Sequence, residues 1–314
     1  MKQMAIFKKK KTLVGNMTYM ALMAAINVIF ILLSAWIPVL FILLIFILPL
    51  ASTIVTYFCE KKYFLIYAIA TIILCTLASF WDIGNVIFYV IPSLVSGFIF
   101  GILIEKAVSP IIIILCGVLA QITLSYLAIP LIYLIYQRNI VTDFATIFSL
   151  QNYTYLQYVQ NIFICVLALV QQAISFMIIY EEISKIDINP RFEKKDDVIV
   201  PSATLGFIAL SVLLAFVFPE LSYSGMILSL LLGFYCVGLL ISKKKRWIII
   251  TLLISLILSL FVFSLLYGPL TTATTRPLGL LVAQIFPLFC AIIVFINNYL
   301  LMKTKKATIE NRQP

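Results

Sequence analysis

Neutral polar and aromatic residues near the ends of the hydrophobic stretches are the part of the sequence best suited to bind a ligand. Asp82, Asn85 and Tyr89 are spaced i, i+3 and i+7, which places them on one helix face. Aromatic walls with a few orienting polar groups are typical of small-molecule sites. We therefore expect a substrate pocket among Trp36, Trp81, Asp82, Asn85, Tyr89, Tyr126, Tyr133 and Asn161. The alternative is an aromatic belt at the membrane surface, which needs no ligand.

Catalytic and metal-binding patterns are missing. The chain contains no histidine, which excludes the serine–histidine pair of rhomboid-type proteases and most zinc and haem ligand sets. The pair Glu181-Glu182 resembles that of CAAX-type membrane proteases, but those enzymes also need histidines. The six cysteines form no C-x-x-C pair, and neither a Walker A motif nor G-x-G-x-x-G is present. We expect no enzyme activity, no cofactor and no metal.

Two stripes of small residues suggest close helix contacts. The first is Ala21-x-x-x-Ala25, and the second is Ser93-x-x-x-Gly97-x-x-x-Gly101. Small residues at this spacing let helix backbones approach each other in lipid. Each stripe therefore predicts either the docking of a partner membrane protein or packing inside this chain.

The elements that position these residues must be membrane-spanning helices. The composition is 64% hydrophobic and 11% charged, whereas soluble domains are about 45–50% apolar and about 25% charged. Soluble enzymes, nucleic-acid modules and secreted disulfide scaffolds are therefore excluded. We predict an all-α polytopic fold with ten spans of the ~20-residue length that a bilayer requires, at 17–36, 39–58, 63–80, 86–104, 110–136, 157–180, 200–219, 225–242, 247–268 and 278–302. Pro38 separates the first two spans, because proline biases its predecessor away from helix.

The basic residues orient the ten predicted spans. With the N-terminus inside, all of the 22 Lys and Arg residues except Arg138 and Arg276 fall in inner segments. This asymmetry is the positive-inside pattern, so we predict that both termini face the cytoplasm. The net charge of +10 therefore indicates contact with anionic lipid rather than with nucleic acid.

The polar connector after the sixth span divides the chain. We expect a six-span domain at 1–181, a cytoplasmic loop at 182–199, a four-span domain at 200–302 and a frayed cytoplasmic tail at 303–314. No charged residue lies at the middle of a predicted span, which argues against an ion-coupled transporter. We expect the deeper polar side chains to hydrogen-bond between helices; they are Asn27, Gln121, Gln171, Gln172 and Gln284.

Residues 1–181 resemble the substrate-binding S components of energy-coupling-factor (ECF) vitamin transporters. The resemblance rests on the basic N-terminus, the M-A-L-M-A-A segment with Ala21-x-x-x-Ala25, Trp36-Ile37-Pro38 at the first outer turn and six spans with both ends inside. It implies that Ala21 and Ala25 contact a coupling subunit. It also implies that substrate binds near the outer surface. The full chain resembles the uncharacterised YybS-like membrane proteins, which have more than six spans.

We therefore expect a solute-binding transport component of the bacterial plasma membrane that works with an ATP-driven coupling module. The alternative is a non-catalytic scaffold or assembly factor of the cell envelope. An outer cavity among the first six spans would favour transport. A filled outer half, with the small-residue stripes facing lipid or another protein, would favour the scaffold.

Overall fold

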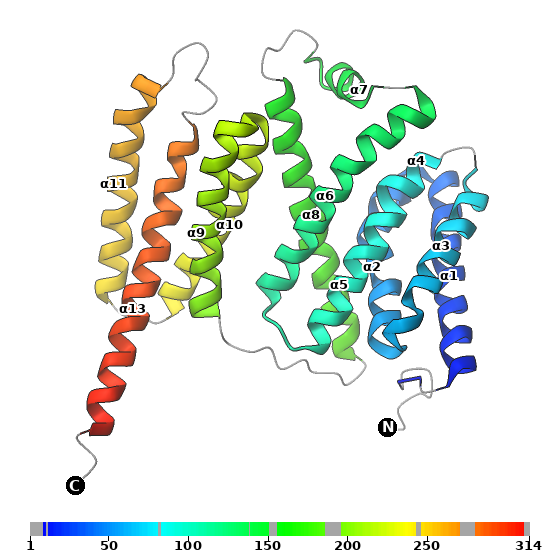
Figure 1. Ribbon diagram of the computed structural model, residues 1–314, viewed down its shortest axis with the longest axis horizontal. Coiled ribbons are helices and arrows are strands. Elements are labelled where there is room, and N and C mark those ends of the chain that lie inside the picture. Colours follow the sequence, from blue (N-terminus) through cyan, green and yellow to red (C-terminus); the bar gives the residue numbers. More distant parts are fainter. Residues whose placement is uncertain are drawn as a thin grey trace. The chain divides into compact units, whose positions relative to one another are not determined.

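The computed structural model describes residues 9–10, 12–80, 83–137, 139–150, 156–185, 196–242, 246–270 and 280–310, and every regular element in these ranges is helical. The chain divides into two compact units (Figure 1). Unit 1 comprises Met1–Asp143 and Ile164–Glu193, and unit 2 comprises Phe144–Phe163 and Lys194–Pro314. Each unit is described by itself.

Unit 1 is a bundle in which α1, α2, α3 and α5 lie side by side and α6 packs on α5 (Figure 1). Its elements are α1 (Leu13–Trp36), α2 (Pro38–Phe58), η2 (Lys61–Tyr63), α3 (Phe64–Ala78), α4 (Ile83–Asn85), η3 (Val86–Val90), α5 (Ile91–Glu105), α6 (Pro110–Tyr136) and most of α8 (Leu156–Lys185). The short helix α7 (Ile140–Ile147) follows α6. The sequence analysis did not anticipate α7.

Unit 2 is built on the pair α9 (Asp196–Val217) and α10 (Pro219–Ser242). The other elements are α11 (Arg246–Leu270), η4 (Leu280–Gln284) and α13 (Ile285–Glu310). Helix α13 packs against α9, α10 and α11.

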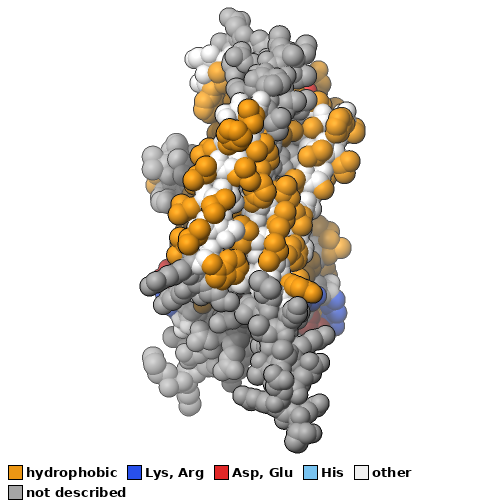
Figure 2. Space-filling model, turned by 90° about the vertical axis from the view of Figure 1, so that its left-hand side faces the viewer, with side chains coloured by type: hydrophobic (Ala, Val, Ile, Leu, Met, Phe, Trp, Pro, Cys, Tyr) orange, Lys and Arg blue, Asp and Glu red, His pale blue; other side chains and the backbone are white. Residues whose placement is uncertain are grey.

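The described helices have the length and surface of membrane spans. Nine of them are long and apolar enough to cross a bilayer, and the described part of α2 adds the apolar segment Ile45–Phe58. Large hydrophobic side chains cover the exposed face of α11 (Figure 2), among them Ile250, Leu253, Ile257 and Leu260. Such a surface is unfavourable in water and favourable in lipid. The chain is therefore an α-helical multi-pass membrane protein, and the count of ten spans and their orientation stay predictions.

Helix α1 ends at Trp36 and α2 begins at Pro38, where the sequence predicts the break. Other helix ends differ from the predicted boundaries. Helix α8 continues to Lys185, and α9 begins at Asp196, so both enter the loop predicted at 182–199. Helix α13 continues to Glu310, into the segment that we expected to be a frayed tail.

Charged residues lie at the extended ends of α8 and α9, where they favour helix. Lys185 in the last turn of α8 pairs with Glu181 and Glu182 at 3.3 and 2.7 Å. The carboxylates of the first turn of α9, Asp196 and Asp197, lie at the positive end of its helix dipole.

Three helices end on a residue in the left-handed conformation, and none of these residues is glycine. Ala107, Gln137 and Ser149 have φ of 55°, 54° and 57°. At the end of α5, the N–H of Val108 donates to Leu103 O and the N–H of Ala107 donates to Ile104 O. This is the Schellman pattern, which satisfies the last carbonyl groups of a helix. A non-glycine residue here is strained by the contact between Cβ and the backbone.

Interhelical hydrogen bonds of the kind that we expected are formed by the deep polar residues Gln121, Gln172 and Gln284. Gln172 Nε2 on α8 donates to Gln121 Oε1 on α6 at 3.2 Å, and both side chains are buried. In unit 2, Gln284 Nε2 donates to Ser211 Oγ on α9 at 2.7 Å. Such bonds replace water as partners for polar groups inside the bilayer.

Candidate functional site

The first small-residue stripe lies on an apolar groove between α1 and α3. Ala21 and Ala25 are both exposed, although each sits among large hydrophobic neighbours. The groove has a volume of about 350 Å³. Its lining residues are Met17, Met20, Ala21, Ala24, Ala25, Ile66, Tyr67, Ala70 and Leu74. The alanines on both helices have only a methyl group as side chain, which is too short to fill this space.

A hydrogen-bonded network fixes the floor of the groove. Tyr67 on α3 is 2% exposed, and its hydroxyl accepts a hydrogen bond from Asn27 Nδ2 on α1 at 3.0 Å. The same hydroxyl lies 3.5 Å from Ser52 Oγ on α2. These contacts join three helices below the groove, which gives the concave surface a defined shape. Asn27 therefore has the interhelical role that the sequence predicts.

The second small-residue stripe is used inside unit 1. A Cβ atom at Gly97 would lie 2.5 Å from Pro49 O and from Ser52 Cβ on α2. A Cβ atom at Gly101 would lie 2.5 Å from Thr56 Cβ. The two glycines therefore let α5 approach the backbone of α2, which confirms the packing interpretation for this stripe. Of the two stripes, only the first lies on the surface of unit 1.

Three of the eight predicted substrate-binding side chains lie outside the described residues. These are Trp81, Asp82 and the side chain of Trp36, whose backbone ends α1. The predicted face that combines Asp82 with Asn85 and Tyr89 is therefore described only at its last two positions.

Asn85 and Tyr89 lie at a π-helical turn. Both side chains are half-buried. Over Val86–Val90 the backbone forms a π-helix, and the N–H of Ile91 donates to Val86 O, five residues back. Pro92 explains this turn. It has no N–H, and a proline ring clashes with the carbonyl four residues before it, so the helical hydrogen bonds change locally from a step of four residues to a step of five. Single π-turns are frequent at functional sites.

On α6, Tyr126 is half-buried, whereas Tyr133 is 52% exposed. Pro130 lies between them inside the helix, as the sequence indicates. One turn later, the Tyr136 hydroxyl accepts a hydrogen bond from Gly84 N–H at 3.0 Å. Tyr136 therefore joins the end of α6 to α4, beside Asn85 in sequence. Sequence reasoning missed this residue, although it follows Tyr133 by three positions.

Asn161 is the one predicted residue in unit 2. It lies in the first part of α8 and is 8% exposed, next to Gln160 at 6%. The other described candidates belong to unit 1. The structure therefore groups Asn85 with Tyr89, keeps Tyr126 and Tyr133 on one helix, and assigns Asn161 to a different unit.

The cysteines and carboxylates of the described residues form no group of three that could hold a metal ion. All six cysteines are free thiols, five of them buried and Cys116 half-buried. Comparisons of the chain with protein-family models, curated proteins and solved structures give no match. The two resemblances drawn from the sequence therefore stay predictions.

Proposed function

We propose that this chain is a non-catalytic membrane subunit that binds a small solute and takes it up together with a partner module in the bacterial plasma membrane. The observation that supports the proposal best is the groove between α1 and α3, where Ala21 and Ala25 are exposed. Helices associate in lipid through small residues that permit close backbone approach. The groove therefore suits one transmembrane helix of a partner. An ATP-driven coupling module is the partner that the S-component resemblance implies.

The solute would bind at the opposite end of α1, where the sequence predicts the outer surface. Asn85 and Tyr89 at the π-turn and Tyr136 bonded to Gly84 are the described groups that support a binding site there. The π-turn supplies backbone that deviates from a regular helix, as functional sites in membrane helices often do.

A scaffold of the cell envelope is the second candidate. It is favoured by a specific observation: the groove between α1 and α3 includes none of the predicted substrate-binding residues. A scaffold would use the same groove for a partner helix and would need no solute.

Purification of the tagged full-length protein from its native membrane in mild detergent tests the proposal. The proteins retained are identified by mass spectrometry and compared with those retained by the Ala21→Leu/Ala25→Leu variant. Two leucines would fill the groove, so we expect recovery of the partner to fall by about tenfold, which corresponds to about 1.4 kcal/mol of docking free energy. Ala209→Leu, at an exposed alanine on α9, is the matched control and should retain the partner.

The identity of the retained proteins separates the two candidates. An ATPase pair with a membrane subunit, lost only in the groove variant, supports transport. Envelope or division proteins without an ATPase, lost in the same variant, support the scaffold. Equal recovery from the wild type and the groove variant would contradict docking in the groove.

A further inference from the structure

A second concave surface lies at the end of unit 1 where α1 and η2 begin and where α2 and α5 end. Its volume is about 490 Å³. It is lined by Lys9, Lys10, Phe58, Cys59, Glu60, Lys61, Lys62 and Glu105, and we call it the basic concavity.

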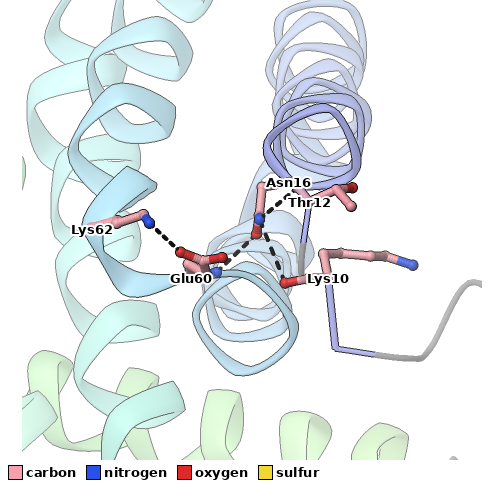
Figure 3. A network of polar contacts seen from close by, with 5 residues as sticks. All are labelled: Lys10, Thr12, Asn16, Glu60 and Lys62. Carbon is pink, nitrogen blue, oxygen red and sulfur yellow. Dashed lines mark hydrogen bonds and ion pairs between the residues drawn. The ribbon is translucent and has the colours of Figure 1, made fainter.

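Buried hydrogen bonds fix the backbone of the basic concavity (Figure 3). Asn16 is fully buried, and its Nδ2 donates to Thr12 O at 2.9 Å and to Lys10 O at 3.5 Å. Its Oδ1 accepts from the N–H of Glu60 at 2.9 Å. The N–H of Lys10 donates to Phe58 O at 2.8 Å. The segment before α1 is thereby attached to the end of α2, and its lysines are held at the surface.

The charges of the basic concavity do not cancel. Lys9 and Lys61 share one carboxylate, that of Glu105, at 2.5 Å each. Lys62 pairs with Glu60 at 2.6 Å. Four lysines and two carboxylates leave two positive charges in excess. An anion is therefore attracted to this surface.

A cation–π contact also holds one of these lysines in place. The Lys10 ammonium lies 5.0 Å from the centre of the Tyr19 ring, whose electron-rich face supports its position. Burial raises the pKa of the Cys59 thiol to about 11, so this group is neutral near pH 7.

We propose that the basic concavity binds a phosphate group, and that the headgroup of an anionic phospholipid supplies it. The site lies at the ends of four apolar helices, and the ends of helices that cross a bilayer meet the layer of lipid phosphates. Lysine ammonium groups form strong charge-assisted hydrogen bonds with phosphate oxygens. This inference goes beyond the proposed function and does not depend on it.

Lipid titration of the full-length protein, read by native mass spectrometry, tests the inference. The probes are dioleoylphosphatidylglycerol and dioleoylphosphatidylcholine, which share their acyl chains and differ in net charge. We expect tighter binding of phosphatidylglycerol. The Lys10→Gln and Lys61→Gln variants should each weaken it by about fivefold, since one lysine near a lipid surface contributes about 1 kcal/mol. Glu105 keeps Lys9 as a partner in Lys61→Gln, so the variant leaves no isolated carboxylate.

Matched controls exclude a general effect of charge. Lys185→Gln removes one positive charge from the end of α8, where Lys185 pairs with Glu181 and Glu182, and it should leave binding unchanged. Glu105→Gln should strengthen binding, because it releases two lysines from their shared carboxylate. Glu182→Gln, the control for that change, should have no effect.

Excess inorganic phosphate identifies the source of the phosphate. If it displaces the lipid, a free phosphate also fits the site, and if it does not, the headgroup is the occupant. Equal binding of the two lipids, or equal losses in Lys10→Gln and Lys185→Gln, would overturn the inference.

Discussion

At the scale of single residues, Gly97 and Gly101 show how strongly one methyl group matters in this bundle. At each position an added Cβ would lie 2.5 Å from atoms of α2, which is closer than van der Waals contact allows. The atoms include the backbone carbonyl of Pro49, which no change of rotamer can move away. The close approach of α5 to α2 therefore requires glycine.

Gly97→Ala should lower the free energy of unfolding by about 1–3 kcal/mol, the usual cost of forcing a methyl group into a packed interface. Gly206→Ala is the control, because a Cβ at Gly206 meets no atom within 4 Å. There the change should raise stability by up to about 1 kcal/mol through helix propensity alone. Unfolding by sodium dodecyl sulfate in mixed micelles, followed by circular dichroism, measures both. Similar effects in the two variants would show that α2 does not constrain Gly97.

At the scale of helices, the ends of elements carry strain that their sequences do not reveal. Helix α5 ends in a Schellman pattern with Ala107 at φ 55°. The hydrogen bonds satisfy the last carbonyl groups of α5 and stabilise its end, whereas the left-handed conformation of Ala107 is strained and destabilises it.

Ala107→Gly should raise the free energy of unfolding by about 0.5–1 kcal/mol, because glycine adopts positive φ without strain. Ala120→Gly, the same chemical change inside α6, should lower it by about 1 kcal/mol. Thermal unfolding in detergent measures the two midpoints. A decrease in both variants would argue against the left-handed conformation of Ala107.

The sequence predicts the elements better than it predicts their details. Hydropathy located most of the spans, and Pro38 located the break between α1 and α2. The π-turn was missed because an apolar sequence has the same hydropathy whether its backbone forms α-helical or π-helical hydrogen bonds, although Pro92 was an available signal. The left-handed ends were missed because they fall on alanine, glutamine and serine instead of glycine.

The candidate site was harder to predict for a similar reason. Ala21-x-x-x-Ala25 and Gly97-x-x-x-Gly101 have the same small-residue spacing, yet the first pair is exposed and the second meets α2. Whether another helix covers a pair depends on which helices pack together in the fold, and the spacing of the pair does not contain that information. The tie between Tyr136 and Gly84 likewise joins residues that are distant in the chain.

At the scale of the whole molecule, the orientation in the membrane is the property most open to a direct test. Lys106 follows α5 and Ser149 follows α7, and the predicted topology places them on opposite sides of the membrane, Lys106 inside. All six native cysteines are buried or half-buried, so their reaction with polar reagents should be slow. The raised pKa of Cys59 slows its reaction further, because at neutral pH the group is below its pKa and stays a thiol.

In intact cells, a membrane-impermeant maleimide should label Ser149→Cys and should label Lys106→Cys only after permeabilisation. The wild-type protein gives the background. The reverse pattern would invert the predicted orientation, and labelling of both variants in intact cells would contradict the number of spans between them.

The packing of α5 on α2 also has a consequence for biosynthesis. Helix α2 leaves the ribosome before α3 and α5. Because synthesis proceeds at about 5–20 residues per second, α5 with its two glycines follows a few seconds later. During that interval its small polar face is in contact with lipid or with the insertion machinery. Thr53 Oγ1 donates to Pro49 O and Thr56 Oγ1 donates to Ser52 O, both at 2.8 Å and both within α2. The helix thus satisfies these hydroxyl groups by itself, so they do not need α5 as a hydrogen-bond partner while α2 enters the bilayer.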